Sequence, residues 1–315
     1  MRIAVVSDKK SGHLSQCLGL RELIVTYKRD KDIFMLHKDL VVLPGFLERF
    51  FTLLNQKLYI FLLKLLNPSL VENKFDFIIC SGSRTVFPGY LLSRCSGAKI
   101  LYIGTPKFRI MKKFDGIIST KSDISKVFKV ISLNLPPSKF ETYEILKKSQ
   151  SENLVLLGGD GSGYDYGEKD WYRLAYEFRP LRTTFINSRR TPDFAWKNLQ
   201  KNSQALHTFL NLEDTDFDDL LDAIDTHSNI FVTADSTSMI VEIISRGYFV
   251  NVIELRGPIQ REHHHEIVEN FQREGLLKII SLSELNKSEN REFGNVKKFV
   301  EKERKDLRDQ IYKLL

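Results

Sequence analysis

The turns that follow apolar runs hold most of the side chains in this sequence that could do chemistry. The most informative turn reads TADSTSMIVE, residues 233–242, where a buried run gives way to small hydroxyl residues and a helix begins. Free backbone N–H groups at a helix start, together with the hydroxyls of Ser236 and Ser238, suit a pyrophosphate. Glu242 follows one turn later, where its carboxylate could bind the diol of a ribose. A capped structural helix is the alternative interpretation of this spacing.

Two further turns in the second half of the chain also suit a phosphorylated ligand. The turn LLGGDGSG, residues 156–163, has four glycines in six residues, which lets the backbone approach a ligand closely. The turn NSRRTP, residues 187–192, offers Arg189 and Arg190, which could neutralise phosphate by bidentate contacts. Structural ion pairs are the alternative role for these arginines. Thr191, which precedes a proline, predicts a helix N-cap.

Two turns in the first half could hold a general base and a polar cradle. SDKKSGH, residues 7–13, follows the first apolar run and opens a helix, and histidine side chains titrate near neutral pH, so His13 is a candidate base. SGSRT, residues 81–85, offers Ser83 and Arg84 to an anionic or hydroxylated ligand. A helix-capping loop and an ordinary strand-to-helix turn are the alternatives for the two segments.

Several metal and cofactor signatures are missing or poorly placed. Three adjacent histidines, residues 263–265, look like metal ligands, but neighbours in sequence rarely converge on one ion. Gln260, just before them, is a better candidate as a contact to sugar hydroxyls. The DxD spacings at residues 30–32 and 214–218 lie in polar stretches away from strand ends, and we interpret them as solvated. No P-loop or GxGxxG fingerprint is present. We therefore expect neither a metal nor a cofactor.

The apolar runs that precede these turns predict the fold class. Each run is continuous rather than alternating, which is typical of parallel strands buried on both faces. Helix-like stretches lie between them, so the chain predicts an α/β fold with doubly wound parallel sheets. The expected strands are residues 2–6, 75–80, 99–103, 116–119, 153–157, 183–186, 229–232, 248–253 and 278–280. The expected helices include residues 14–29, 170–178, 217–225 and 238–246.

The alternation of strands and helices predicts two domains that face a cleft. It is interrupted at residues 134–152, where two prolines precede a polar run, and a new strand then leads into the glycine-rich turn. We place the boundary there, with domains at residues 1–148 and 149–315, and expect ligands at the carboxyl ends of the strands. The charged stretch 283–315 predicts a terminal helix that could pack back on the first domain.

Composition limits the class of partner and the compartment. The 47 Lys and Arg residues exceed the 40 Asp and Glu residues, which gives a net charge of +7. This excess permits an anionic substrate or an acidic membrane surface, and we find no nucleic-acid-binding signature. Three dispersed cysteines and no long apolar span predict a cytoplasmic protein. The aromatic segment at residues 41–66 could touch the inner face of a membrane, or it could form a buried helical hairpin.

These motifs together resemble a known family. SGHLSQCLGL, SGSRT, LLGGDGSGY, FINSRRTPD and VTADSTSMIVEIISRG occur in the order found in the bacterial and plant family named after a mitochondrial-fission factor, elongated mitochondria. The resemblance spans roughly residues 3–275. It implies a GT-B-like fold of two Rossmann-like domains, in which the second domain holds the nucleotide-sugar donor.

The resemblance also implies roles for individual residues. In GT-B enzymes that act on lipid-linked glycans, a Glu on the equivalent helix binds the donor ribose, and a Gly-His pair lies near the acceptor. Here His13, or failing that Asp8, would deprotonate the acceptor hydroxyl, and Gly12, Ser83 and Arg84 would lie on the acceptor side. The expected donor-binding residues are Gly158, Gly159, Ser162, Ser188, Arg189, Arg190, Thr233, Asp235, Ser236, Ser238, Met239, Glu242 and Gln260.

The leading hypothesis is therefore a metal-independent glycosyltransferase. It would move a sugar from a nucleotide-sugar to a cell-envelope acceptor, either a lipid-linked glycan or a glycolipid of the lipopolysaccharide type. The alternative is a non-catalytic, membrane-associated adaptor that keeps the fold and recruits a protein partner, as plant members are thought to do. An epimerase that uses NAD is disfavoured because the dinucleotide fingerprint is missing.

Overall fold

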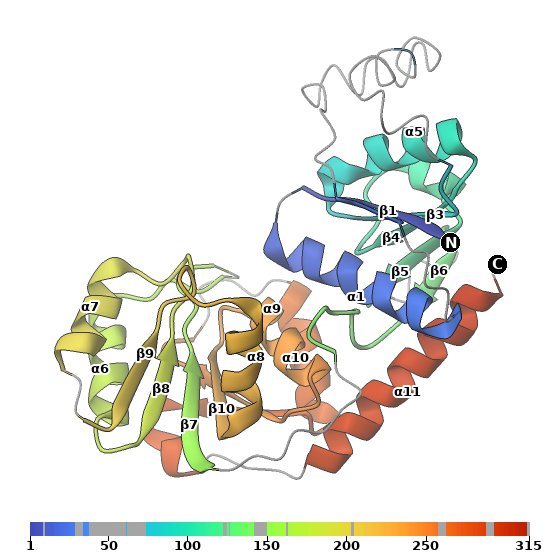
Figure 1. Cartoon of the computed structure of the whole chain (residues 1–315). Coiled ribbons are helices and arrows are strands. Elements are labelled where there is room, and N and C mark those ends of the chain that lie inside the picture. Colours follow the sequence, from blue (N-terminus) through green and yellow to red (C-terminus); the bar gives the residue numbers. More distant parts are fainter. Residues whose placement is uncertain are drawn as a thin grey trace. The chain divides into compact units, whose positions relative to one another are not determined.

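The chain divides into two compact units, each of which is described by itself. Unit 1 comprises Met1–Lys139 and Glu301–Leu315, and unit 2 comprises Phe140–Val300. The division at residues 139/140 therefore precedes the expected boundary at 148/149. The computed structural model (Figure 1) describes residues 1–8, 10–28, 34–37, 61, 74–121, 125, 127–141, 150–161, 163–202, 205–257, 263–287 and 293–313.

Unit 1 is built on a parallel sheet with the strand order β2-β1-β3-β4-β5-β6. Its strands are β1 (Arg2–Val6), β2 (Phe34–His37), β3 (Phe77–Ser81), β4 (Lys99–Ile103), β5 (Gly116–Ser119) and β6 (Val130–Ser132). Both faces are covered, which explains why the central strands are apolar throughout. Alternate residues such as Ile78 and Ile100 share one core with α5 (Val86–Ser96), and their neighbours Ile79 and Leu101 share the other with α1 (Ser11–Lys28).

The last helix, α11 (Phe293–Tyr312), contributes its final turns to unit 1. Leu307 and Ile311 are buried in the core on the α1 side of the sheet. The carboxylate of Glu303 accepts a hydrogen bond from the Asn134 backbone N–H at 2.8 Å, and Arg304 donates to the Leu135 carbonyl at 2.8 Å. These buried polar contacts satisfy backbone groups that a double-proline segment cannot pair within a helix or sheet.

Unit 2 is built on a second parallel sheet, with the strand order β12-β11-β10-β7-β8-β9. Its strands are β7 (Gln150–Leu156), β8 (Thr183–Ile186), β9 (His207–Leu210), β10 (His227–Thr233), β11 (Val250–Glu254) and β12 (Leu277–Ser281). Its described helices include α6 (Glu168–Phe178), α7 (Asp193–Lys201), α8 (Phe217–Thr226), α9 (Thr237–Ser245) and α10 (His263–Arg273). The prediction of doubly wound α/β sheets is confirmed.

Each sheet has one point where the strand order reverses direction. In unit 2 the chain runs outward from β7 through β8 to β9, then returns to place β10 on the other side of β7. In unit 1 the corresponding point lies between β1 and β3. The crevice outside the carboxyl ends of such a strand pair is where open parallel sheets bind ligands. Ligands are therefore expected at the turns that follow β7, β10, β1 and β3.

Candidate functional site

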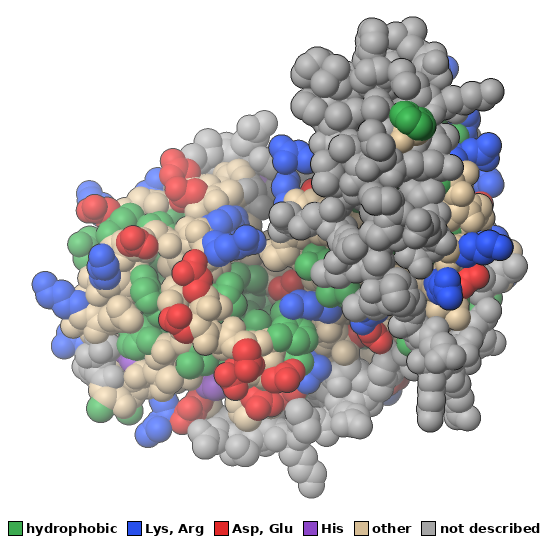
Figure 2. All heavy atoms as spheres, turned by 45° about the horizontal axis from the view of Figure 1, so that its top comes forward, with side chains coloured by type: hydrophobic (Ala, Val, Ile, Leu, Met, Phe, Trp, Pro, Cys, Tyr) green, Lys and Arg blue, Asp and Glu red, His purple; other side chains and the backbone are tan. Residues whose placement is uncertain are grey.

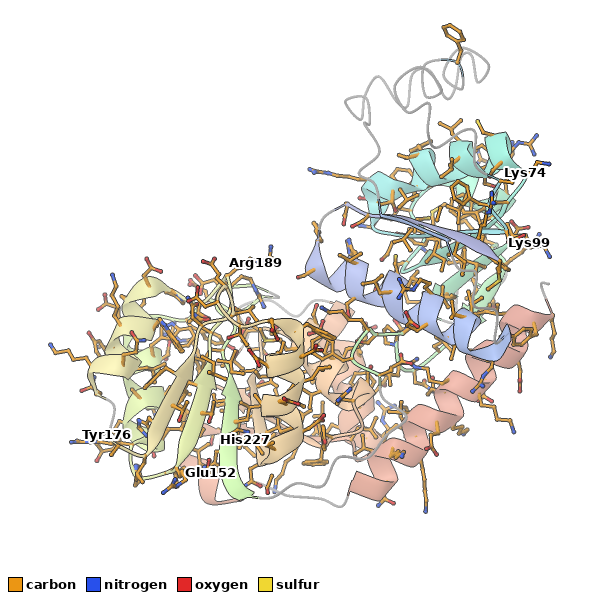
Figure 3. All side chains as sticks on the ribbon, viewed as in Figure 1. Lys74, Lys99, Glu152, Tyr176, Arg189 and His227 are labelled. Atoms are coloured by element: carbon orange, nitrogen blue, oxygen red, sulfur yellow. The ribbon has the colours of Figure 1, made fainter. Side chains whose placement is uncertain are left out.

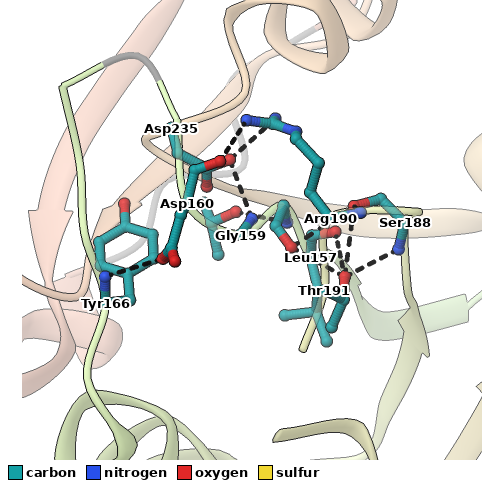
Figure 4. Close-up of polar contacts among 10 residues, drawn as sticks. Leu157, Gly159, Asp160, Tyr166, Ser188, Arg190, Thr191 and Asp235 are labelled. Carbon is teal, nitrogen blue, oxygen red and sulfur yellow. Dashed lines mark hydrogen bonds and ion pairs between the residues drawn. The ribbon is translucent and has the colours of Figure 1, made fainter. Parts of the chain in front are cut away.

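The glycine turn after β7 is bonded directly to the end of β10. The Gly158 N–H donates to Thr233 Oγ1 at 2.7 Å. Figure 4 shows the next bond, in which the Gly159 N–H donates to Asp235 Oδ2 at 3.0 Å. Thr233 and Asp235 are fully buried. These bonds join the two strands that flank the reversal point of unit 2, so the turn forms the floor of the expected ligand crevice.

Only glycine fits at two positions of this turn. A Cβ atom at Gly158 would lie 2.1 Å from Asp235 Oδ2, and one at Gly159 would lie 1.9 Å from the Arg190 carbonyl oxygen. Both distances are far shorter than real Cβ contacts. From the sequence, the glycines were expected to let a ligand approach the backbone. In the structure they also make room for the Asp235 carboxylate and for the turn after β8 that contains Arg190.

The guanidinium of Arg190 contacts a buried carboxylate, whereas part of its side chain is exposed to solvent. Its Nη2 lies 2.8 Å from Asp235 Oδ2, and its Nη1 donates to the Asp160 carbonyl at 3.3 Å. The side chain of Arg190 is 41% exposed, whereas that of Asp235 is 0% exposed. Arg190 is thus a preoriented cation at the carboxyl edge, and Figure 3 shows its neighbour Arg189 at the opposite end of unit 2 from Glu152 and His227.

Thr191 has a role that the sequence did not predict. Its hydroxyl lies 2.9 Å from the Leu157 carbonyl and 2.8 Å from the Gly158 carbonyl, and it accepts the Ser188 N–H at 2.8 Å. The residue at the N-cap of α7 is Pro192, so the interpretation of Thr191 as the cap was wrong. Thr191 instead fastens the Arg190 turn to the glycine turn.

The start of α9 lies next to these residues in sequence and carries the expected hydroxyl groups. Ser236 is the N-cap residue, and Ser238 is exposed in the first turn. Met239 and Glu242 are partly buried. Ser238 and Glu242 are four residues apart and therefore share one side of the helix. The first N–H groups of a helix have no intrahelical partner, so this end is suited to bind an anion.

The electrostatics of Asp235 follow from its complete burial. Burial raises the pKa of the Asp235 carboxyl, and the opposing effects of Arg190, the Gly159 N–H and the Thr233 hydroxyl do not cancel this shift. Its second oxygen, Oδ1, is buried and has no hydrogen-bond partner among the described residues. Ionised Asp235 therefore lowers the stability of the folded state, and carboxyl groups with shifted pKa values of this kind are common at functional sites.

The raised pKa predicts a distinctive effect of Asp235→Asn on stability. Because the folded pKa exceeds the unfolded value of about 3.9, ionised Asp235 destabilises the fold as pH rises from that value through the folded pKa. The asparagine does not titrate, so the stability of Asp235→Asn relative to the parent protein should increase with pH across this window and then level off. Urea unfolding at several pH values measures the difference. Asp218→Asn, at an exposed site, is the control, and a difference independent of pH would contradict the assignment.

Unit 1 holds a second cluster, at the reversal point between β1 and β3. His13 Nδ1 lies 3.0 Å from both carboxylate oxygens of Asp8. The Asp8 side chain is 4% exposed and that of His13 is 33% exposed. A Cβ at Gly82 would lie 2.5 Å from His13 Nδ1, so the glycine after β3 makes room for the pair. The carboxylate orients the imidazole and leaves Nε2 as the ring nitrogen that could accept a proton.

The remaining acceptor-side residues lie around this pair. Gly12 is in the first turn of α1, and Ser83 and Arg84 are exposed on the short helix at Ser83–Thr85. Ser81, the first residue of the predicted polar cradle, is buried instead, and its hydroxyl donates to Gln16 Oε1 at 3.1 Å and to the Ile103 carbonyl at 3.0 Å.

The remaining residues singled out in the sequence either cap a helix or lie outside the described part of the chain. Ser162, Gln260 and residues 41–66 apart from Phe61 lie outside the described residues. The Asp216 carboxylate caps α8 by accepting the Asp219 N–H at 2.8 Å. Among the described residues, no three His, Cys, Asp or Glu side chains gather as a metal-ligand set. No described helix combines the length and apolar character that a bilayer span requires.

Comparison with known proteins identifies related sequences and folds. The model of the family described as mitochondrial fission ELM1 matches residues 11–302. The chain matches no curated protein sequence. Among solved structures, MurG from Acinetobacter baumannii is 14% identical, with a TM-score of 0.52 and 99% of both chains covered.

Two further structures have the same fold. LpCGTa, solved in complex with UDP, is 10% identical, with a TM-score of 0.57 and 99% of both chains covered. UDP-GlcNAc 2-epimerase from Neisseria meningitidis, bound to UDP-GlcNAc, is 13% identical, with a TM-score of 0.52, and the match covers 96% of this chain and 90% of that one. The fold class is therefore GT-B, as the sequence resemblance implied.

Proposed function

Because the chain belongs to the mitochondrial fission ELM1 family and has the GT-B fold, we propose that it is a glycosyltransferase that uses a nucleotide-sugar donor. The observation that supports this most directly is the carboxyl edge of unit 2. There the glycine turn and the start of α9 follow β7 and β10, which flank the reversal point, and the anchored Arg190 follows the neighbouring strand β8. This arrangement suits a ligand that carries a diphosphate.

The donor would be held by charge and by backbone groups. In the proposed complex, Arg190 and the first N–H groups of α9 neutralise the diphosphate, and Glu242 binds the ribose. Both phosphate contacts also stabilise the negative charge that grows on the departing diphosphate. The reaction would then need no metal, and activity should persist in EDTA.

The acceptor would be activated by His13 in unit 1. As the acceptor oxygen bonds to the anomeric carbon, His13 Nε2 takes the proton of the acceptor hydroxyl. The bond between that carbon and the diphosphate oxygen breaks, and its electrons leave on the diphosphate. Asp8 acts through His13 as a positioning residue, because it contacts Nδ1. We propose a cell-envelope acceptor, of the lipid-linked or lipopolysaccharide type, on the strength of the family resemblance.

Thermal unfolding with UDP, CMP, ADP and GDP tests the donor site. A nucleotide at one hundred times its Kd should stabilise the native state by about 2.7 kcal/mol, so one of the four should raise the Tm. Arg190→Gln should reduce that shift, whereas Lys201→Gln, at an exposed position on the last turn of α7, should not. If no nucleotide changes the Tm of the parent protein, the non-catalytic adaptor is the better description.

Analysis of the reaction products distinguishes sugar transfer from the other reactions that proteins with this fold catalyse. The epimerase with this fold was solved with UDP-GlcNAc, so nucleotide-sugar binding alone does not establish transfer. A nucleotide-sugar screen against a membrane extract that lacks this protein, read by mass spectrometry, should show a new glycosylated product. Appearance of only an epimeric nucleotide-sugar would contradict the proposal.

A further inference from the structure

The two units carry opposite net charges. Unit 1 contains 28 Lys and Arg residues and 14 Asp and Glu residues, and unit 2 contains 19 and 26 respectively. Their net charges are therefore +14 and −7, although the whole chain carries only +7. Charge asymmetry of this size between two parts of a chain points to an anionic surface as the partner of the basic part.

Five of the 28 basic residues of unit 1 form an exposed strip around the connection between β4 and β5. The residues that connect β4 to β5 read TPKFRIMKKF and include the short helix at Arg109–Lys113. The strip consists of Lys107, Arg109, Lys112, Lys113 and Lys129, all of them exposed. Figure 2 shows one face of the molecule, on which described Lys and Arg side chains are exposed beside Asp and Glu side chains.

Apolar side chains hold the strip in place and extend it. Met111 and Phe114 are buried in the core on the α5 side of the sheet. Phe108, Ile110 and Phe128 are partly buried against the same core. The Lys129 carbonyl accepts the Ile117 N–H at 2.8 Å, so the residues before β6 lie beside the start of β5, which follows the short helix. Next to Phe128, the Val127 side chain is 51% exposed. The strip thus presents cations with apolar groups between them.

The charges of Lys107, Arg109 and Lys112 are available to an external partner, whereas Lys113 Nζ lies 5.9 Å from the centre of the Tyr90 ring. Lys107, Arg109 and Lys112 make no hydrogen bond or ion pair within the described part of the chain. The nearby carboxylate of Asp115 is already used, because it accepts the Ile100 N–H at 2.8 Å. The strip therefore lacks an internal counter-charge in the described residues, unlike Arg190, which is paired with Asp235.

We propose that this strip binds the surface of a bilayer that contains anionic lipids. Lysine and arginine attract anionic headgroups, and exposed aliphatic groups such as Val127 enter the boundary with the acyl chains. A nucleic acid would also attract the cations, but the aromatic side chains Phe108 and Phe128 are packed against the core, and the exposed Val127 offers no stacking surface. Unit 2, with its net negative charge, is repelled by the same bilayer, so the protein binds with unit 1 toward the lipid. The inference rests on unit 1 and does not depend on the proposed reaction.

Co-sedimentation with vesicles tests the proposal. We expect the full chain to bind vesicles that contain phosphatidylglycerol more tightly than vesicles of phosphatidylcholine alone, and to lose this preference at high salt. A basic residue near an anionic surface contributes about 1 kcal/mol, so the triple variant Lys107→Gln, Arg109→Gln, Lys112→Gln should bind roughly 100-fold more weakly. Val127→Ser should weaken binding further without changing the salt dependence.

Controls distinguish this result from loss of fold or of nucleotide binding. The triple variant Lys169→Gln, Lys197→Gln, Lys201→Gln removes as many exposed cations from unit 2 and should bind vesicles like the parent protein. The strip variant should keep its Tm and any nucleotide-induced shift. The proposal is overturned if vesicle binding ignores phosphatidylglycerol or survives the strip variant. The proposal is also overturned if an oligonucleotide displaces the protein from the vesicles and the strip variant no longer binds that oligonucleotide.

Discussion

Replacing His13 with alanine should lower kcat by about 100- to 10,000-fold and leave the Kd for the nucleotide unchanged. The imidazole is held by Asp8 at 3.0 Å, at the reversal point of the unit 1 sheet, whereas the candidate donor contacts come from unit 2. Loss of the base removes an interaction made only in the transition state, so kcat falls without a change in ground-state binding. Steady-state kinetics and nucleotide titration measure the two quantities separately.

Two variants show whether the effect belongs to the Asp8–His13 pair. Asp8→Asn keeps a hydrogen-bond partner for Nδ1 but can present an N–H in place of an acceptor, so it should lower kcat at least tenfold. His227→Gln removes a histidine at the start of β10, at the amino edge of unit 2 (Figure 3), and should leave kcat unchanged. If His13→Ala retains full turnover, the base is another group and the role assigned to unit 1 is wrong.

Central strands were predictable, whereas three of the four edge strands were not; the fourth, β12, was expected at residues 278–280. The strands at Lys99–Ile103 and Gly116–Ser119 begin and end at the residues expected from the sequence, because both are buried on both faces and form continuous apolar runs. β9, at His207–Leu210, was missed. It lies at the edge of its sheet and is largely half-exposed, so its apolar pattern is weak. β2 and β6, the edge strands of unit 1, were missed as well.

The site could be predicted in its residue types but not in its contacts. Arg190, Asp235 and the glycines were identified because they follow strands, and parallel strands bring their carboxyl ends to one edge. The close packing of Gly158 on Asp235 joins residues 77 positions apart, which no local pattern encodes. Thr191 was misinterpreted because Thr before Pro is typical of a helix start, and only the tertiary structure shows its hydroxyl at two carbonyls of the glycine turn.

Replacing Gly159 with alanine should have the largest effect on the donor site. The new Cβ would lie 1.9 Å from the Arg190 carbonyl oxygen, so either the glycine turn or the Arg190 turn must move by about 1 Å. Overpacking against a backbone atom costs about 3 kcal/mol, which should appear as a lower free energy of unfolding in urea. The same movement displaces the guanidinium from Asp235, so the nucleotide-induced rise in Tm should be lost.

Gly257→Ala is the matched control for this substitution. Gly257 also follows a strand of unit 2, it is exposed, and no described atom lies within 4 Å of the position its Cβ would take. It should therefore retain both the stability and the nucleotide response of the parent protein. If Gly159→Ala is destabilised yet still responds to the nucleotide, the turn supports the fold but does not contact the donor. If Gly159→Ala loses neither property, the contact between the two turns does not exist in solution, and the donor site assigned to unit 2 fails with it.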